Sequence, residues 1–95
     1  MSMDEKVMMG WREFKVSEKI GDGPGKTNTV QFRNQTDSKG KYTLKVGDAP
    51  SKRHELKAGE KSEKYEIQKK AWNASNEGST ALEYERDNRA DPNVT

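Results

Sequence analysis

Apolar side chains recur at every second position over most of this chain, and this spacing constrains the fold more than any other feature. Between Lys41 and Val46 the apolar residues are Tyr42, Leu44 and Val46, with polar residues between them. Successive side chains of a β-strand point to opposite faces, so this run predicts a strand with one buried face and one face in water. The same spacing recurs at Phe14/Val16, Val30/Phe32, His54/Leu56, Tyr65/Ile67 and Leu82/Tyr84.

Residues that favour turns separate these runs. Clusters containing Gly, Pro, Asn and Asp stand at 21–25, 37–40, 47–50, 58–60 and 73–79, and each of these residue types promotes a turn through its backbone conformation or its side-chain hydrogen bonds. The sequence therefore predicts strands near 11–20, 28–34, 41–47, 52–57, 62–72 and 80–86. A break of the fifth at Lys69-Lys70 would give a seventh strand. The first needs a bulge or bend if Trp11 and Ile20 are to face the same side.

Short strands separated by turns are typical of antiparallel sandwiches and small barrels, and no segment carries a helical stripe. The predicted fold class is all-β: a small antiparallel β-sandwich of Ig-like or Greek-key type with six or seven short strands. A chain of 95 residues forms one domain. We place this domain at 11–86, with a flexible N-terminus at 1–10 and a flexible polar tail at 87–95.

The composition leaves disorder open as an alternative. Leu, Ile, Val and Phe account for only 12 of the 95 residues, below the roughly 20% at which chains are classed as disordered when their net charge is also high. Two observations favour folding. The formal net charge is only +2, and the apolar residues are placed in order rather than scattered.

Several classes of protein are excluded by what the sequence lacks. The longest apolar run, Val7–Met9, can neither span a bilayer nor serve as a secretory signal. Because the chain has no Cys, it has no disulfide or thiolate site, and a cytoplasmic location is expected. Asn-x-Ser/Thr sequons begin at Asn34, Asn73 and Asn93, but glycosylation would require a secretory route.

Catalytic groups are scarce, so we expect a protein that is not an enzyme and that needs no cofactor. His54 is the only histidine and alternates with Leu56, which favours a half-buried sheet position over an acid–base role. Candidate carboxylate pairs stand in strand-like runs beside Lys or Arg and are better read as cross-strand ion pairs; these are Glu63, Glu66, Glu83 and Glu85.

Oxygen-bearing residues in the turns offer a candidate Ca²⁺ site. In an up-and-down arrangement, the turns after alternate strands emerge at the same end of the sheet. Ca²⁺ takes several such oxygens and tolerates irregular loops, although Asp and Asn are also ordinary turn residues. The candidate metal ligands are Asp22, Asp48, Asn76 and Glu77, with Asn73 beside them.

The middle of the chain is basic. Residues 26–70 carry 12 basic and 6 acidic side chains, whereas both flanking segments carry more acidic than basic side chains. Outward-pointing cations on neighbouring strands would form a positive face for an acidic polysaccharide, nucleic acid or anionic membrane surface. A solvated face that discourages edge pairing is the alternative. The candidate anion-binding residues are Arg33, Lys41, Lys45, Arg53 and Lys57.

The function that fits these observations best is a non-enzymatic interaction module that presents loops or an edge strand to a protein partner. Such a thin core also makes a homo-oligomer useful, since association buries apolar surface. Trp11 and Trp72 are the candidate contact aromatics, because an exposed Trp marks a contact patch. The anion-binding module is the alternative function.

Overall fold

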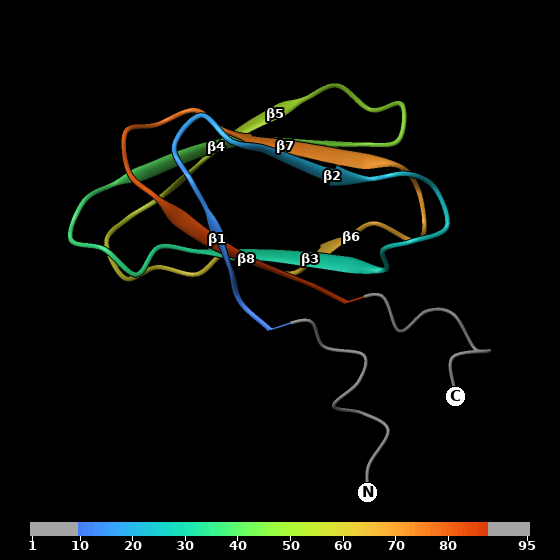
Figure 1. Ribbon diagram of the computed structural model, residues 1–95. Coiled ribbons are helices and arrows are strands. Elements are labelled where there is room, and N and C mark those ends of the chain that lie inside the picture. The colour runs from blue at the N-terminus through green and yellow to red at the C-terminus, as the bar shows by residue number, and fades with distance from the viewer. Residues whose placement is uncertain (1–9, 88–95) are drawn as a thin grey trace, which may run out of the picture.

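The computed structural model describes residues 10–87, which form two β-sheets stacked face to face (Figure 1). One sheet has the strand order β1-β8-β3-β6 and the other β2-β7-β4-β5, and all neighbouring strands are antiparallel. The strands are β1 (Arg12–Phe14), β2 (Lys19–Asp22), β3 (Thr29–Arg33), β4 (Gly40–Val46), β5 (Lys52–Leu56), β6 (Tyr65–Glu66), β7 (Trp72–Asn76) and β8 (Leu82–Asp87). Within the described range, no helix is long and apolar enough to cross a membrane.

This strand order is that of a jelly roll, a double-sheet architecture built from two Greek keys. The predicted all-β antiparallel sandwich is confirmed. The described residues form eight strands rather than six or seven, and the Ig-like variant of the prediction is not confirmed because the strands are ordered differently in an Ig domain. The predictions for the termini fall on residues outside the described range, apart from Gly10 and Asp87, which ends β8.

Two predicted strands are each divided in the structure. The first is interrupted by a turn in which Ser17 has a φ of 69° and the Glu18 N–H donates to the Lys15 carbonyl (2.9 Å). Val16 therefore points to solvent, 44% exposed, and not into the core as its spacing from Phe14 predicted. The fifth is interrupted at Gln68 and Lys69, whose φ angles of 53° and 65° reverse the chain.

The strand after that second interruption, β7, was predicted as a turn region. Its sequence, Trp-Asn-Ala-Ser-Asn, is poor in the β-branched residues that mark strands. Nevertheless Trp72, Ala74 and Asn76 alternate inward and are buried. Asn76 satisfies its amide there by donating to the Phe14 and Thr80 carbonyls, each at 3.0 Å. A buried, fully bonded Asn thus replaces an apolar residue at the end of this strand.

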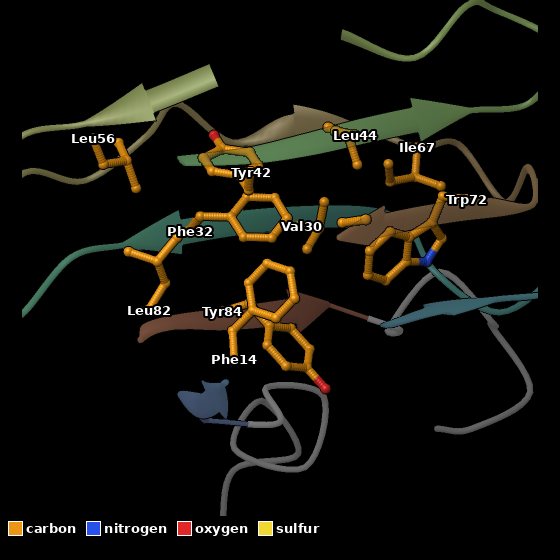
Figure 2. Packing of buried hydrophobic residues seen from close by; sticks show 11 residues of the cluster. Phe14, Val30, Phe32, Tyr42, Leu44, Leu56, Ile67, Trp72, Leu82 and Tyr84 are labelled. Carbon is orange, nitrogen blue, oxygen red and sulfur yellow. The ribbon is translucent and has the colours of Figure 1, made fainter. Parts of the chain in front are cut away.

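Aromatic residues make up much of the core. Phe14, Phe32, Tyr42, Trp72 and Tyr84 belong to a cluster of eleven buried hydrophobic residues between the sheets (Figure 2). The rings of Phe32 and Tyr42, from opposite sheets, stack with centroids 4.3 Å apart. No buried side-chain nitrogen or oxygen within residues 10–87 lacks a hydrogen bond. Large rings and satisfied polar groups therefore fill an interior for which the sequence supplies few aliphatic residues.

Candidate binding surface

Four cations stand on the outer face of the β2-β7-β4-β5 sheet. Two of these cations, Lys19 and Arg53, stand at the ends of one row across the sheet. In this row Lys19 is in register with Ser75, Ser75 with Thr43, and Thr43 with Arg53. Their side chains point outward because Tyr42 and Leu44, the strand neighbours of Thr43, are buried in the core. Strands lie about 4.8 Å apart, which separates Lys19 from Arg53 by about 14 Å.

Lys41 and Lys45 complete this arrangement along β4. Each stands two residues from Thr43, so both share its outward direction and lie about 13 Å from each other. Lys19, Lys41, Lys45 and Arg53, hereafter the basic face, thus surround the hydroxyl groups of Thr43 and Ser75. None of the four has an ion-pair partner within residues 10–87. The nearby Glu55 is paired instead with Lys39, at 3.5 Å.

Two cations predicted for this surface lie elsewhere. Arg33 belongs to the other sheet, where its Nε donates to Glu83 at 2.6 Å. Its guanidinium also lies 4.2 Å from the ring centre of Trp11. Lys57 follows β5 in a turn and donates its N–H to the Glu60 carboxylate at 2.8 Å. Lys19 was not predicted, because its sheet neighbours come from a part of the chain that the sequence assigned to a turn.

A groove opens beside the basic face, between β5 and β6. These are edge strands of the two sheets, and each pairs with a single strand among residues 10–87. The groove measures about 250 Å³, just under the roughly 300 Å³ at which pockets for drug-sized ligands begin. Its lining combines apolar and ionisable residues: Leu44, Val46, Ala49, Pro50, Lys52, His54, Glu63 and Tyr65.

A small polar cluster forms the inner wall of the groove. The Tyr42 and Tyr65 hydroxyl groups are hydrogen-bonded at 2.7 Å, joining the two sheets. The His54 ring stacks on Tyr42 with centroids 5.1 Å apart and lies 5.3 Å from the ring of Tyr65. Burial lowers the pKa of His54 below 6.5, and the nearby Glu63 carboxylate partly offsets this effect. Burial raises the pKa of both tyrosines above 10, so this wall is uncharged near pH 7.

The candidate metal ligands are divided between two ends of the sheet. Asp22 is paired in register with Trp72, whereas Asn76 stands four residues further along β7, about 13 Å away. Asp48 follows β4 at the Asp22 end, and Glu77 follows β7 at the other end. The structure therefore brings no more than part of this set together. Within residues 10–87, no three His, Asp or Glu side chains are grouped to hold a metal ion.

Asp22 and Asn76 serve the fold instead. The Asp22 carboxylate accepts hydrogen bonds from the Thr27 hydroxyl at 2.6 Å and from Arg86 at 2.6 and 2.7 Å. It also accepts from Trp72 Nε1 at 3.2 Å. Because Arg86 lies on β8 and Asp22 on β2, this carboxylate joins the two sheets.

The two candidate contact aromatics have different environments. Trp72 is 3% exposed and its indole points into the core, so the prediction that it contacts a partner is corrected (Figure 2). Trp11 is half-buried, and Arg33 covers its ring. Among the sequons, Asn34 is buried and bonded on both sides of its amide, whereas Asn73 is exposed on β7. Asn93 lies outside the described residues.

The sequence matches no protein-family profile and no curated protein. Solved structures do match. The CENP-C cupin domain of Drosophila melanogaster has a TM-score of 0.54 at 12% identity, covering 92% of this chain and 65% of that chain. Drosophila melanogaster CENP-C bound to CAL1 has a TM-score of 0.55 at 12% identity, covering 92% of this chain and 70% of that chain. The Drosophila melanogaster CENP-C cumin domain has a TM-score of 0.54 at 11% identity, covering 90% of this chain and 60% of that chain. The likeness concerns the fold alone. This chain thus spans about 60 to 70% of the proteins it matches.

Proposed function

We propose that this chain is a non-enzymatic protein-interaction module that binds an acidic segment of a partner protein on the basic face. The observation that carries the proposal is the set of four cations around Thr43 and Ser75 on one flat sheet face, without ion-pair partners among the described residues. Maintaining like charges on one face is electrostatically unfavourable unless a complementary ligand offsets it. One of the matched structures is itself a complex with a protein.

The face also lacks the side chains with which sheets bind nucleic acid. Outward positions on β4 and β7 carry Lys, Thr, Asn and Ser, with no aromatic ring on which bases could stack. Glu55, which stands opposite Lys41 on the same face, and Glu77, which lines the same hollow as both, would repel phosphates. These features favour a protein partner, whose carboxylates can be spaced to avoid both acids, over a uniformly charged polyanion.

A titration with poly-glutamate tests this function. ¹H–¹⁵N spectra of the full chain are recorded with poly-glutamate at about 50 and 200 mM salt, where a charge-driven interaction weakens at the higher concentration. Shifts should concentrate on the amides of β4, β5 and β7. The double substitution Lys45→Glu and Arg53→Glu should weaken binding about tenfold or more.

The matched control is Lys26→Glu combined with Lys64→Glu, which makes the same charge change at exposed positions outside the basic face. It should weaken binding far less. Equal losses for the two double variants would refute a localised site. Tighter binding of heparin or duplex DNA through the same residues would indicate that the ligand of the basic face is a polyanion and not a protein. A concentration-dependent dimer in sedimentation that blocks the face would identify a second copy as the occupant.

A further inference from the structure

We infer that the acidic partner segment binds as an added β-strand along the free edge of β5, with one aromatic side chain in the groove between β5 and β6. This inference rests on the proposed function and specifies how the segment is held. Edge strands present unpaired backbone donors and acceptors, and extended peptides exploit them by adding a strand. Main-chain hydrogen bonds then supply affinity, and pockets for alternate side chains supply specificity.

The position of the groove is the first reason. Among the described residues, β5 has a neighbour only on its β4 side, and its inward side chains Lys52 and His54 line the groove. In a strand added at the free edge of β5, every second side chain would point inward. One of these would stand next to His54, at a strand spacing of about 4.8 Å. The groove that begins beside His54 is also lined by Tyr65 of the other sheet and by Leu44 of β4. An inward side chain would therefore enter a preformed space.

The size and lining of the groove indicate which side chain fits. At about 250 Å³ it suits one large side chain better than a separate small molecule. Leu44, Val46 and Pro50 give it an apolar floor, and the uncharged rings of His54 and Tyr65 form a wall on which another ring can stack. An aromatic residue of the partner satisfies both features.

Charge determines the residues that flank this aromatic side chain. Arg53 points outward from β5 and is exposed, so the outward residues of an added strand would stand directly beside it. Opposite charges in neighbouring strands stabilise the pairing. The other outward residue next to His54 is Glu55, which would repel a carboxylate. The expected segment therefore has a carboxylate on the side of the aromatic residue that faces Arg53 and an uncharged residue on the side that faces Glu55; in an antiparallel added strand the carboxylate directly follows the aromatic residue. A second copy of β5 would instead bring Lys52 and Arg53 against like charges, which disfavours self-pairing.

The test uses the full chain and the peptide acetyl-Ser-Thr-Thr-Phe-Glu-Thr-Ser-amide, whose Glu faces Arg53 when it pairs antiparallel with β5. Replacing its Phe by Ala keeps this charge and should weaken binding about tenfold, the loss expected for a buried aromatic anchor. Two further peptides carry N-methyl groups on alternate sets of amides. Only one set faces β5 in an added strand, so one N-methylated peptide should lose binding and the other should retain it. The amides of residues 52–56 and 65–66 should shift most.

Protein variants provide the matched comparison. Ala49→Asp adds a carboxylate to the groove lining at an exposed turn position, and Ala58→Asp makes the same change in the turn beyond β5. Ala49→Asp should weaken the Phe peptide several-fold and leave the Ala peptide unchanged, while Ala58→Asp should change neither.

The outcomes separate the two proposals. Equal binding of the Phe and Ala peptides, with both N-methylated forms still bound, would refute strand addition and leave the acidic-segment function intact. Failure of every acidic ligand to bind, poly-glutamate included, would refute the proposed function itself. Undiminished binding after the peptide's Glu is replaced by Gln would show that the groove binds an apolar strand without the basic face.

Discussion

Substituting Asp22 by Ala should destabilise the sandwich by about 2–5 kcal/mol, because this carboxylate joins the two sheets. The substitution removes the acceptor for Thr27, Trp72 and Arg86 together. The Trp72 N–H keeps a second acceptor, the Thr27 hydroxyl oxygen at 2.9 Å. Thr27 is 0% exposed, so its hydroxyl loses the Asp22 acceptor without access to water, at a cost of about 1–3 kcal/mol.

Arg86 contributes the remainder of the loss. Breaking a fully buried ion pair costs about 3–5 kcal/mol, and an exposed pair contributes at most about 1. The Arg86 and Asp22 side chains are 23% and 19% exposed, so an intermediate value of about 1–2 kcal/mol applies. Combining Asp22→Ala with Arg86→Ala isolates this part as a coupling energy.

Urea unfolding followed by circular dichroism measures these free energies, with an unchanged slope expected for a change in stability alone. The matched control is Asp48→Ala, an acid-to-Ala change at an exposed turn position, which should cost less than about 0.5 kcal/mol. Comparable losses for Asp22→Ala and Asp48→Ala would refute the reasoning. Strict additivity of Asp22→Ala and Arg86→Ala would show that the ion pair contributes nothing.

Three other predictions concern stability. Leu44→Ala should cost about 2–5 kcal/mol in the same urea assay, because it opens a cavity in the core, whereas Lys45→Ala on the outer face should be near neutral; equal effects would contradict the strand assignment. Asn34→Ala should cost about 2–4 kcal/mol, because it leaves the Leu56 and Ser38 carbonyls and the Thr36 N–H without this partner, and a loss under about 0.5 would show that water replaces the amide. The pKa of His54 in the folded chain lies below its unfolded value of 6.5. Its contribution to stability should therefore be complete above pH 6.5 and be lost as the pH falls through the folded pKa. His54→Phe should remove this pH dependence of the unfolding free energy, and an unchanged dependence would assign it to other groups.

Alternation predicted four strands closely because their sequences place large apolar residues between charged ones. β3, β4 and β5 lie within one residue of the expected bounds, whereas β8 begins two residues and ends one residue later than expected. β7 was missed because Asn, Ala and Ser carry no such contrast. Its strand character depends on partners distant in the chain, such as the Phe14 carbonyl that accepts from Asn76. Local spacing carries no information about such partners.

The sequence predicts which way the cations of the candidate surface point, but not which cations belong to that surface. Alternation places Lys41 and Lys45 outward between the apolar residues of β4, and it places Arg53 outward because His54 and Leu56 take the inward positions of β5. It cannot assign a strand to a sheet, so Arg33 was grouped with cations that belong to the other sheet. The groove was equally inaccessible to the sequence. It is lined by β4, the turn after β4, β5, Glu63 and Tyr65, and the sheet topology that brings these segments together cannot be derived from local spacing.

The two open sides of this sandwich are closed unequally, and this difference favours binding at β5. Along β1 and β2 the sheets are joined by the Asp22–Arg86 ion pair and by the Asn76 amide bonded to the Phe14 carbonyl. Along β5 and β6, the Tyr42–Tyr65 hydroxyl pair joins opposing strands above an unfilled groove. A core with few aliphatic residues cannot fill both sides, so the groove-lining residues Val46, Ala49 and Pro50 keep accessible apolar surface where the closure is weakest. An added strand would cover that surface and pair the free edge of β5 in the same step, whereas at β2 it would find the space between the sheets already occupied.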